Sequence, residues 1–193
     1  MPRRMSFSVR RFAALACLLA GLVALTGCKN ERENDAGREG LPQNVGHLDY
    51  NVFITRELNL RDAEDRGYYQ GPEAPPGFAL YGVFLQVCNP NGSVNAPHWM
   101  SASNFQIEDT QGNKFKPLQL PANNIWAYKP RPLKEHACIP TIGSLPASGP
   151  TNGALIIFRL PLTTLENRPL DLRITAPPSA DGLRDTGLIE LDV

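Results

Sequence analysis

The chain has 193 residues, with 19 basic and 19 acidic side chains and no formal net charge. Hydrophobic residues make up 42% and charged residues 20%, which is ordinary for a globular protein. Its 16 glycines and 18 prolines exceed what an all-helical protein would carry. The composition excludes collagen, coiled coils, multi-pass membrane proteins and strongly basic nucleic-acid binders, and the length fits about one domain.

The N-terminal 28 residues have the pattern of an export signal. Arg3, Arg4, Arg10 and Arg11 precede an apolar run over residues 12–25, and this region contains no acidic residue. A basic segment followed by a short apolar one is typical of a secretory signal peptide, and the run is too short for a spanning helix. An uncleaved anchor or a short core helix is the alternative interpretation.

The tetrapeptide Leu25-Thr26-Gly27-Cys28 resembles the lipobox of bacterial lipoproteins. The resemblance implies cleavage that removes residues 1–27 and a diacylglycerol on Cys28. Two or three acyl chains would then hold the protein on a membrane, since one chain alone binds marginally. We therefore expect a location on the outer face of the cytoplasmic membrane. Because Lys29 follows the anchor instead of Asp, the outer membrane is an alternative in a two-membrane bacterium.

The segment after the lipobox is predicted to be a tether. Residues 29–40 contain no large apolar side chain, so they lack the surface to offset the entropy cost of ordering. We expect residues 28–46 to form the lipidated cysteine and a flexible charged linker, with a binding peptide as the alternative. The mature chain would keep 15 basic and 19 acidic residues. That balance disfavours nucleic acid as a partner.

Residues 47–193 carry the signals of β-structure. Apolar and polar residues alternate over 48–55 and 170–175, which predicts strands with one buried face. Apolar runs over 78–88 and 153–160 predict strands of the core, the second buried on both faces. Further strands are predicted at 105–108, 114–116 and 188–193.

About seven short strands separated by Gly- and Pro-rich turns favour an all-β antiparallel sandwich. Residues 59–77 are predicted to form a loop, and no segment outside the export signal has a helical period. The Pro-rich insert over residues 119–150 is the one long irregular region of the domain. Long loops of this kind are usually functional or partly disordered.

Three motifs indicate a family resemblance. An apolar strand ends in Val87-Cys88-Asn89, residues 105–109 are followed by Gly112, and Gly153 opens an apolar strand that closes at Pro161. Over about 47–176 this pattern resembles the immunoglobulin-like domains of unknown function found in many bacterial surface lipoproteins. The resemblance implies an immunoglobulin-like sandwich outside the cell membrane and supplies no catalytic residues.

The cysteines divide into two pairs. Cys17 would leave with the signal peptide and Cys28 would carry the lipid. Cys88 and Cys138 would then meet in an oxidising compartment, where we predict a disulfide that closes a loop of about 50 residues. Two unpaired, mostly buried thiols are the alternative.

A soft-metal site is a second hypothesis for one of these cysteines. His98 and Met100 form a His-x-Met pair, and His136 and Cys138 form a His-x-Cys pair. Imidazole, thiolate and thioether ligands together suit copper, and alternate residues of a strand point to the same side. This hypothesis predicts that the four side chains converge.

No nucleophile elbow, zinc-protease helix, P-loop or dinucleotide motif occurs, so the sequence predicts no enzyme and no cofactor. The acidic residues Asp62, Glu64 and Asp65 lack the spacing of a calcium loop and are predicted to lie in a solvated loop.

Trp99, Trp126 and Tyr128 are the candidate binding residues, with core or loop-anchoring roles as the alternative. The sequence favours a lipid-anchored, noncatalytic binding or accessory module with a protein partner in the cell envelope. An extracytoplasmic copper carrier is the alternative. The first interpretation predicts an exposed apolar or aromatic patch near residues 123–128.

Overall fold

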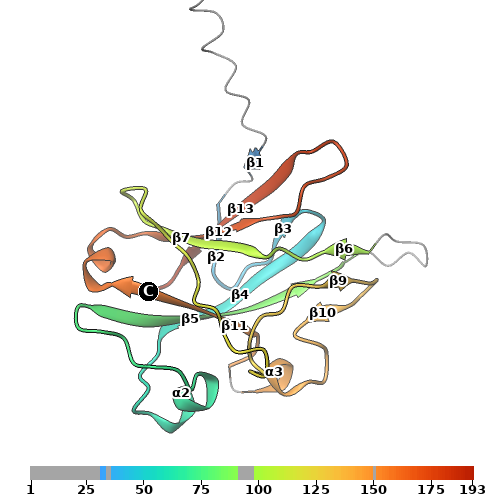
Figure 1. Ribbon diagram of the computed structural model, residues 1–193. Helices are drawn as coiled ribbons and strands as arrows, with labels where there is room; N and C mark the ends of the chain where they lie inside the picture. The colour runs from blue at the N-terminus through green and yellow to red at the C-terminus, as the bar shows by residue number, and fades with distance from the viewer. Residues whose placement is uncertain (1–30, 34–35, 91–97, 150) are drawn as a thin grey trace, which may run out of the picture. The chain divides into compact units, whose positions relative to one another are not determined.

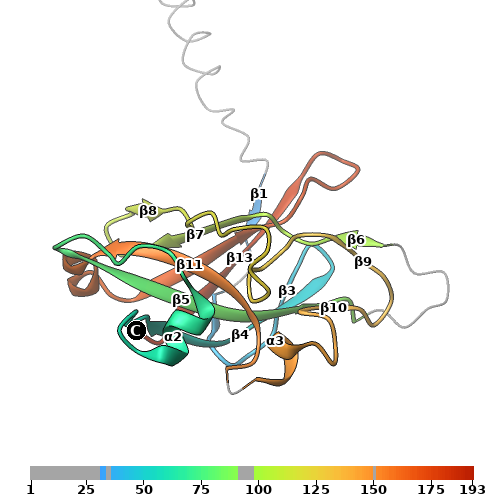
Figure 2. The same ribbon diagram turned by 60° about the horizontal axis from the view of Figure 1, so that its bottom comes forward.

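The computed structural model describes residues 31–33, 36–90, 98–149 and 151–193. Most of its strands belong to two sheets that enclose a common apolar core (Figures 1 and 2). The predicted signal peptide and Cys28 lie outside the described residues. In the part of the chain that is described, no helix has the length and apolarity needed to cross a bilayer.

The first sheet is antiparallel and is built around β5. Its strands are β3 (Gln43–Val45), β4 (Leu48–Glu57), β5 (Phe78–Cys88), β10 (Cys138–Ile139) and β11 (Ala154–Pro161). β4 pairs with one edge of β5, while β10 and β11 share the other edge. β3 completes the sheet as a hairpin with β4.

The second sheet has the order β1-β13-β12-β7-β8, and β2 also pairs with β13. Its strands are β1 (Glu31–Glu33), β2 (Gly37–Arg38), β7 (Asn104–Glu108), β8 (Lys114–Phe115), β12 (Leu170–Thr175) and β13 (Arg184–Leu191). β1 and β2 run parallel to β13, and the other pairs are antiparallel. A separate two-stranded ribbon joins β6 (Trp99–Met100) to β9 (Pro132–Leu133).

The connectivity is that of an immunoglobulin-like sandwich. The long strands β4, β5 and β11 of one sheet correspond to strands A, B and E, and β7, β8, β12 and β13 of the other correspond to C, C′, F and G. The predicted all-β sandwich is therefore confirmed. The Pro-rich insert lies between β8 and β11, where strand D runs in the standard fold.

Burial on both faces of β5 and β11 produces two apolar clusters. Tyr81, Val83, Leu85 and Val87 of β5 face the core between the sheets, as the alternation predicted. On the outer face of the same sheet, a second cluster forms beneath the loops that cover it: Leu58, Leu60, Tyr68, Tyr69, Leu80, Phe84, Leu155 and Ile157. Apolar contacts therefore hold the covering loops, residues 58–74 and 118–126, against the sheet. We call these loops the loop layer.

The prediction of a flexible linker is wrong where β1, β2 and β3 form within it. β2 pairs with β13 and β3 pairs with β4, so the chain is ordered before Leu48. The side chain of Val45 is only 1% exposed, and a Cβ at Gly187 would lie 2.4 Å from it. Glu39 fixes the same segment, because its carboxylate accepts the backbone N–H groups of Thr55 and Asp192. These long-range contacts order the segment although its composition is polar.

Short helices lie between the strands, and two of them fall in the segments predicted to be irregular. They are α2 (Ala63–Tyr68), α3 (Leu145–Ser148) and the 3₁₀ helix η1 (Leu162–Glu166). Their lengths of six, four and five residues are too small for a visible helical period. α2 and α3 lie on one side of the sandwich, and β1 and β13 lie on the other (Figures 1 and 2).

Candidate binding surface on the Pro-rich insert

Trp126 lies between two clefts in the loop layer. The α2 cleft has a volume of about 480 Å³ and is lined by Tyr68, Gly71 and Asn123 among others. The insert cleft has a volume of about 450 Å³ and is lined by Ile139, Pro146 and other residues of the insert. Both volumes fall within the range of about 300–1,000 Å³ that is usual for ligand sites.

Asn124 fixes the backbone on which Trp126 stands. Its Oδ1 accepts the N–H groups of Trp126 and Ala127, at 2.8 and 3.2 Å. Its Nδ2 donates to the carbonyl oxygen of Tyr68 in α2, at 2.9 Å. The carbonyl oxygen of Trp126 accepts the N–H of Leu155 in β11, at 2.7 Å. The wall between the clefts is therefore tied to the first sheet and to α2 by directional bonds.

Two exposed aliphatic side chains stand at the rim of the insert cleft. Ile125 and Leu145 both line it, and each is 60% exposed. Below them, Ile139, Pro146 and Ala154 are buried. Adjacent exposed and buried apolar side chains in one concave site are typical of an interaction surface, whereas a single exposed leucine is not.

Two cations also line the insert cleft. Lys129 donates from Nζ to the carbonyl oxygen of Ala122, at 2.7 Å. Arg131 donates from Nη2 to the carbonyl oxygen of Cys138 and to Thr141 Oγ1, at 2.7 and 2.8 Å. Among the described side chains, neither cation has a carboxylate within ion-pair distance. Their charges are thus unneutralised beside an apolar site.

The disulfide predicted between Cys88 and Cys138 is present, with an S–S distance of 2.05 Å. The two residues lie directly opposite each other in the antiparallel pairing of β5 and β10. Because β10 belongs to the insert, the bridge fastens it to the central strand of the first sheet. Ile139, the next residue of β10, is thereby held in place as part of the cleft lining.

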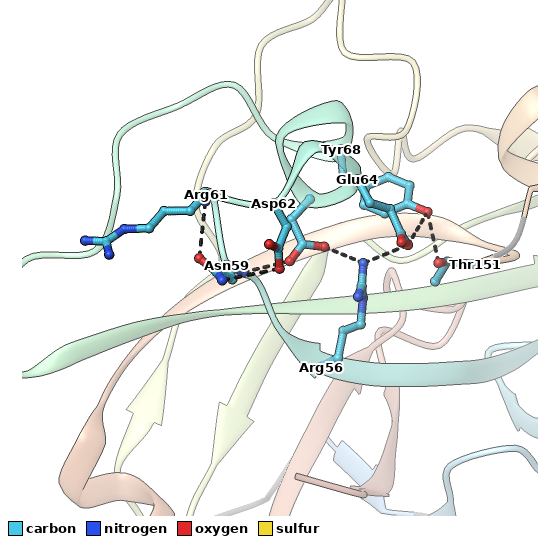
Figure 3. A network of polar contacts seen from close by, with 8 residues as sticks. Arg56, Asn59, Arg61, Asp62, Glu64, Tyr68 and Thr151 are labelled. Carbon is cyan, nitrogen blue, oxygen red and sulfur yellow. Dashed lines mark hydrogen bonds and ion pairs between the residues drawn. The ribbon is translucent and has the colours of Figure 1, made fainter.

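The far wall of the α2 cleft rests on a partly buried ion pair (Figure 3). Arg56 of β4 pairs with Asp65 and Glu64 of α2, and Asp65 also accepts the backbone N–H of Asn59 at 2.7 Å. Tyr68 bonds through its hydroxyl to Glu64 and Thr151. Asp65 is 3% exposed, so the prediction that the whole acidic run is solvated is wrong for this residue.

The three aromatic candidates do not share one surface. Trp126 lines both the α2 cleft and the insert cleft. Tyr128 is partly buried against the main core and donates from its hydroxyl to the carbonyl oxygen of Ala102 at 2.8 Å. Burial raises the pKa of the Tyr128 hydroxyl above its ordinary value. Trp99 stacks on His47, with ring centroids 3.9 Å apart, and packs against the main core.

The hypothesised copper ligands are not assembled into a site by the described residues. The sulfur of Cys138 is bonded to Cys88, so it is not available as a thiolate. His98 and His136 are exposed, and Met100 is 44% exposed. Across the described ranges, no group of three or more His, Cys, Asp or Glu side chains is arranged to hold a metal. No observation favours the carrier over a binding module.

Ile125 lies within the patch predicted near residues 123–128, but sequence reasoning did not single it out and missed Leu145 and Arg131. An isolated aliphatic residue in a loop gives no local signal, because its exposure depends on how the loop folds back on the sheet. The density of prolines in the insert was the available clue, since Pro140 and Pro146 both line the insert cleft.

No family model and no curated protein sequence matches the chain. Among solved structures, the chain is similar to the crystal structure of the yjhA protein from Bacillus subtilis. The identity is 10% and the TM-score is 0.47, over 81% of this chain and 99% of the other. A similarity at this level supports no argument about fold or function.

Proposed function

We propose that the protein is a noncatalytic binding module of the cell envelope, anchored by a lipid on Cys28, and that the insert cleft holds a protein partner. The observation that carries this proposal is the exposure of Ile125 and Leu145 over a cleft of about 450 Å³. Residues exposed in this way lose favourable burial unless a partner covers them. Hydrogen bonds to β11 and the disulfide hold the cleft lining in place before binding.

The N-terminal strand of the described domain lies apart from the insert cleft. β1 begins at Glu31, three residues after Cys28, and pairs with β13. β13 and the insert helix α3 lie on opposite sides of the sandwich (Figures 1 and 2). The first strand of the described domain therefore lies away from the insert cleft and leaves it free for a partner.

The proposal is tested by photocrosslinking in living cells. A benzophenone amino acid replaces Ile125 in the full chain, and the same replacement at Leu162, which is 49% exposed and outside the insert, is the matched control. We expect one discrete adduct that depends on position 125 and disappears when Leu145→Ser is added. An equal pattern of adducts at both positions would contradict the proposal.

A further inference from the structure

We infer that the partner segment held by the insert cleft is acidic as well as apolar: an extended peptide in which Asp or Glu alternates with a large aliphatic or aromatic residue. This inference rests on the proposed function and adds the chemistry of the ligand. It follows from the charge distribution of the insert. It also follows from the position of Lys129 and Arg131 in the cleft, where neither has a carboxylate partner among the described side chains.

The charge of the insert is opposite to that of the rest of the mature chain. Residues 119–150 carry three basic side chains and one acidic side chain. The remainder of the chain from Cys28 onward carries 12 basic and 18 acidic side chains. A basic apolar site on an acidic protein attracts an acidic ligand to that site and repels it elsewhere, so the charge contrast selects the ligand and its place of binding.

The cations are also held in position for an incoming carboxylate. Arg131 uses Nη2 to contact Cys138 and Thr141, and both cations line the same cleft as Ile125 and Leu145. Ser144 lines it too, and its Oγ has no hydrogen-bond partner among the described residues. A segment with apolar and acidic side chains would cover the apolar rim and neutralise both charges. A purely apolar segment would bury those charges unpaired, which is costly.

The experiment measures binding of defined peptides to the exported full chain in mild detergent. Trp99→Phe leaves Trp126 as the single tryptophan, so its fluorescence reports on the cleft. The probes are acetyl-Glu-Leu-Glu-Phe-Glu-amide, its analogue with Gln for every Glu, its analogue with Lys for every Glu, and an acidic analogue with Ser for Leu and Phe. Titrations at low and high salt separate the charge contribution from the apolar one.

We expect the acidic apolar peptide to bind about tenfold more tightly than the Lys peptide at low salt, given the usual strength of exposed ion pairs. Lys129→Gln should weaken the acidic peptide about threefold and leave the Gln peptide unchanged. Lys116→Gln, at an exposed cation outside the cleft, is the control and should alter neither.

Two outcomes would overturn the inference, and they differ in what they say of the proposed function. Equal affinities for the acidic, Gln and Lys peptides would show an apolar binding cleft without charge selection. The inference would then fail, and the proposed function would remain. No Trp126 response to any apolar peptide would also overturn the inference. The crosslink at position 125 would then decide the proposed function independently.

Discussion

The ring of Trp126 meets the ring of Tyr68 edge to face, with centroids 4.8 Å apart. This contact joins the Pro-rich insert to α2, and Tyr68 also packs edge to face on Phe84 of β5. Aromatic pairs of this geometry add about 0.5–1.5 kcal/mol beyond the burial of their area. The wall between the two clefts therefore packs on the outer apolar cluster. Its position depends on the contacts that hold α2.

Arg56 is predicted to be the main support of α2. Arg56→Met leaves the carboxylate of Asp65, whose side chain is 4% exposed, without its cation. Because the Arg56 side chain is itself 30% exposed, we expect a loss of about 2–3 kcal/mol in the free energy of unfolding, below the usual cost of breaking a fully buried pair. Urea unfolding measures it.

The double variant Arg56→Met/Asp65→Leu removes both charges and should recover most of that loss. Arg61→Ala, in the same loop and exposed, is the control and should change the free energy by less than about 0.5 kcal/mol. If Arg56→Met and Arg61→Ala lower the free energy of unfolding by equal amounts, the ion pair does not support α2.

The disulfide is predicted to stabilise the domain and to hold the cleft. Its two cysteines are 50 residues apart, and closing such a loop contributes at most about 4 kcal/mol in the chain-entropy model. We expect Cys88→Ala/Cys138→Ala to lower the free energy of unfolding by about 2–4 kcal/mol, measured by denaturant titration. The native chain treated with a reductant should lose a similar amount. An unchanged unfolding midpoint under both conditions would be evidence against this role.

Asp109 predicts a specific dependence of stability on pH. Burial alone would raise its pKa, but hydrogen bonds from Asn113, Asn167 and the backbone of Gln111 outweigh burial and hold the pKa below its ordinary value. As the pH falls below about 4, the unfolded chain takes up a proton before the folded chain does, and the stabilisation is lost.

The difference in unfolding free energy between the native chain and Asp109→Asn should therefore be largest near neutral pH. It should shrink as the pH falls from about 4 toward 2. Urea unfolding at several pH values measures it, with Glu73→Gln at an exposed carboxylate as the control. A difference that stays constant over this range would mean that Asp109 does not titrate in the folded state as its hydrogen bonds require.

The proposed lipid anchor is tested at Cys28. Cys28→Ser should move the exported protein from the membrane fraction to the soluble fraction, because it removes the attachment point of the acyl chains. Intact mass should show a diacylglycerol on the native chain and none on the variant. Retention of the variant in the membrane fraction after a high-salt wash would contradict the anchoring.

The strands were largely predictable because their side chains carry a direct signal. Alternation assigned Val83 and Leu85 to the inner face of β5, and both are fully buried. The pairing of Cys88 with Cys138 was predictable because only these two of the four cysteines lie outside the predicted signal peptide and lipobox. In each case, the identity of the residue was sufficient, and no knowledge of the loops was required.

The ordered conformation of the predicted linker could not be predicted in this way, and neither could the shape of the candidate site. Glu39 reads as a solvated charge, yet it accepts N–H groups from Thr55 and from Asp192, which is 153 residues away in sequence. Likewise, Ile125 and Leu145 are separated by 20 residues and come together only when the insert folds against β11. Local patterns do not encode such long-range contacts.

The most direct measurement asks whether the insert cleft is covered in the cell. Ile125→Cys and Leu162→Cys are each labelled with a hydrophilic maleimide, on the purified protein and on cells whose envelope is opened to the reagent, with mass spectrometry to confirm that the Cys88–Cys138 bridge is intact. We predict slower labelling in cells than in the purified protein at position 125 alone. The assignment of the cleft as the binding site would be contradicted if the labelling rate in cells, divided by the rate in the purified protein, were the same at both positions.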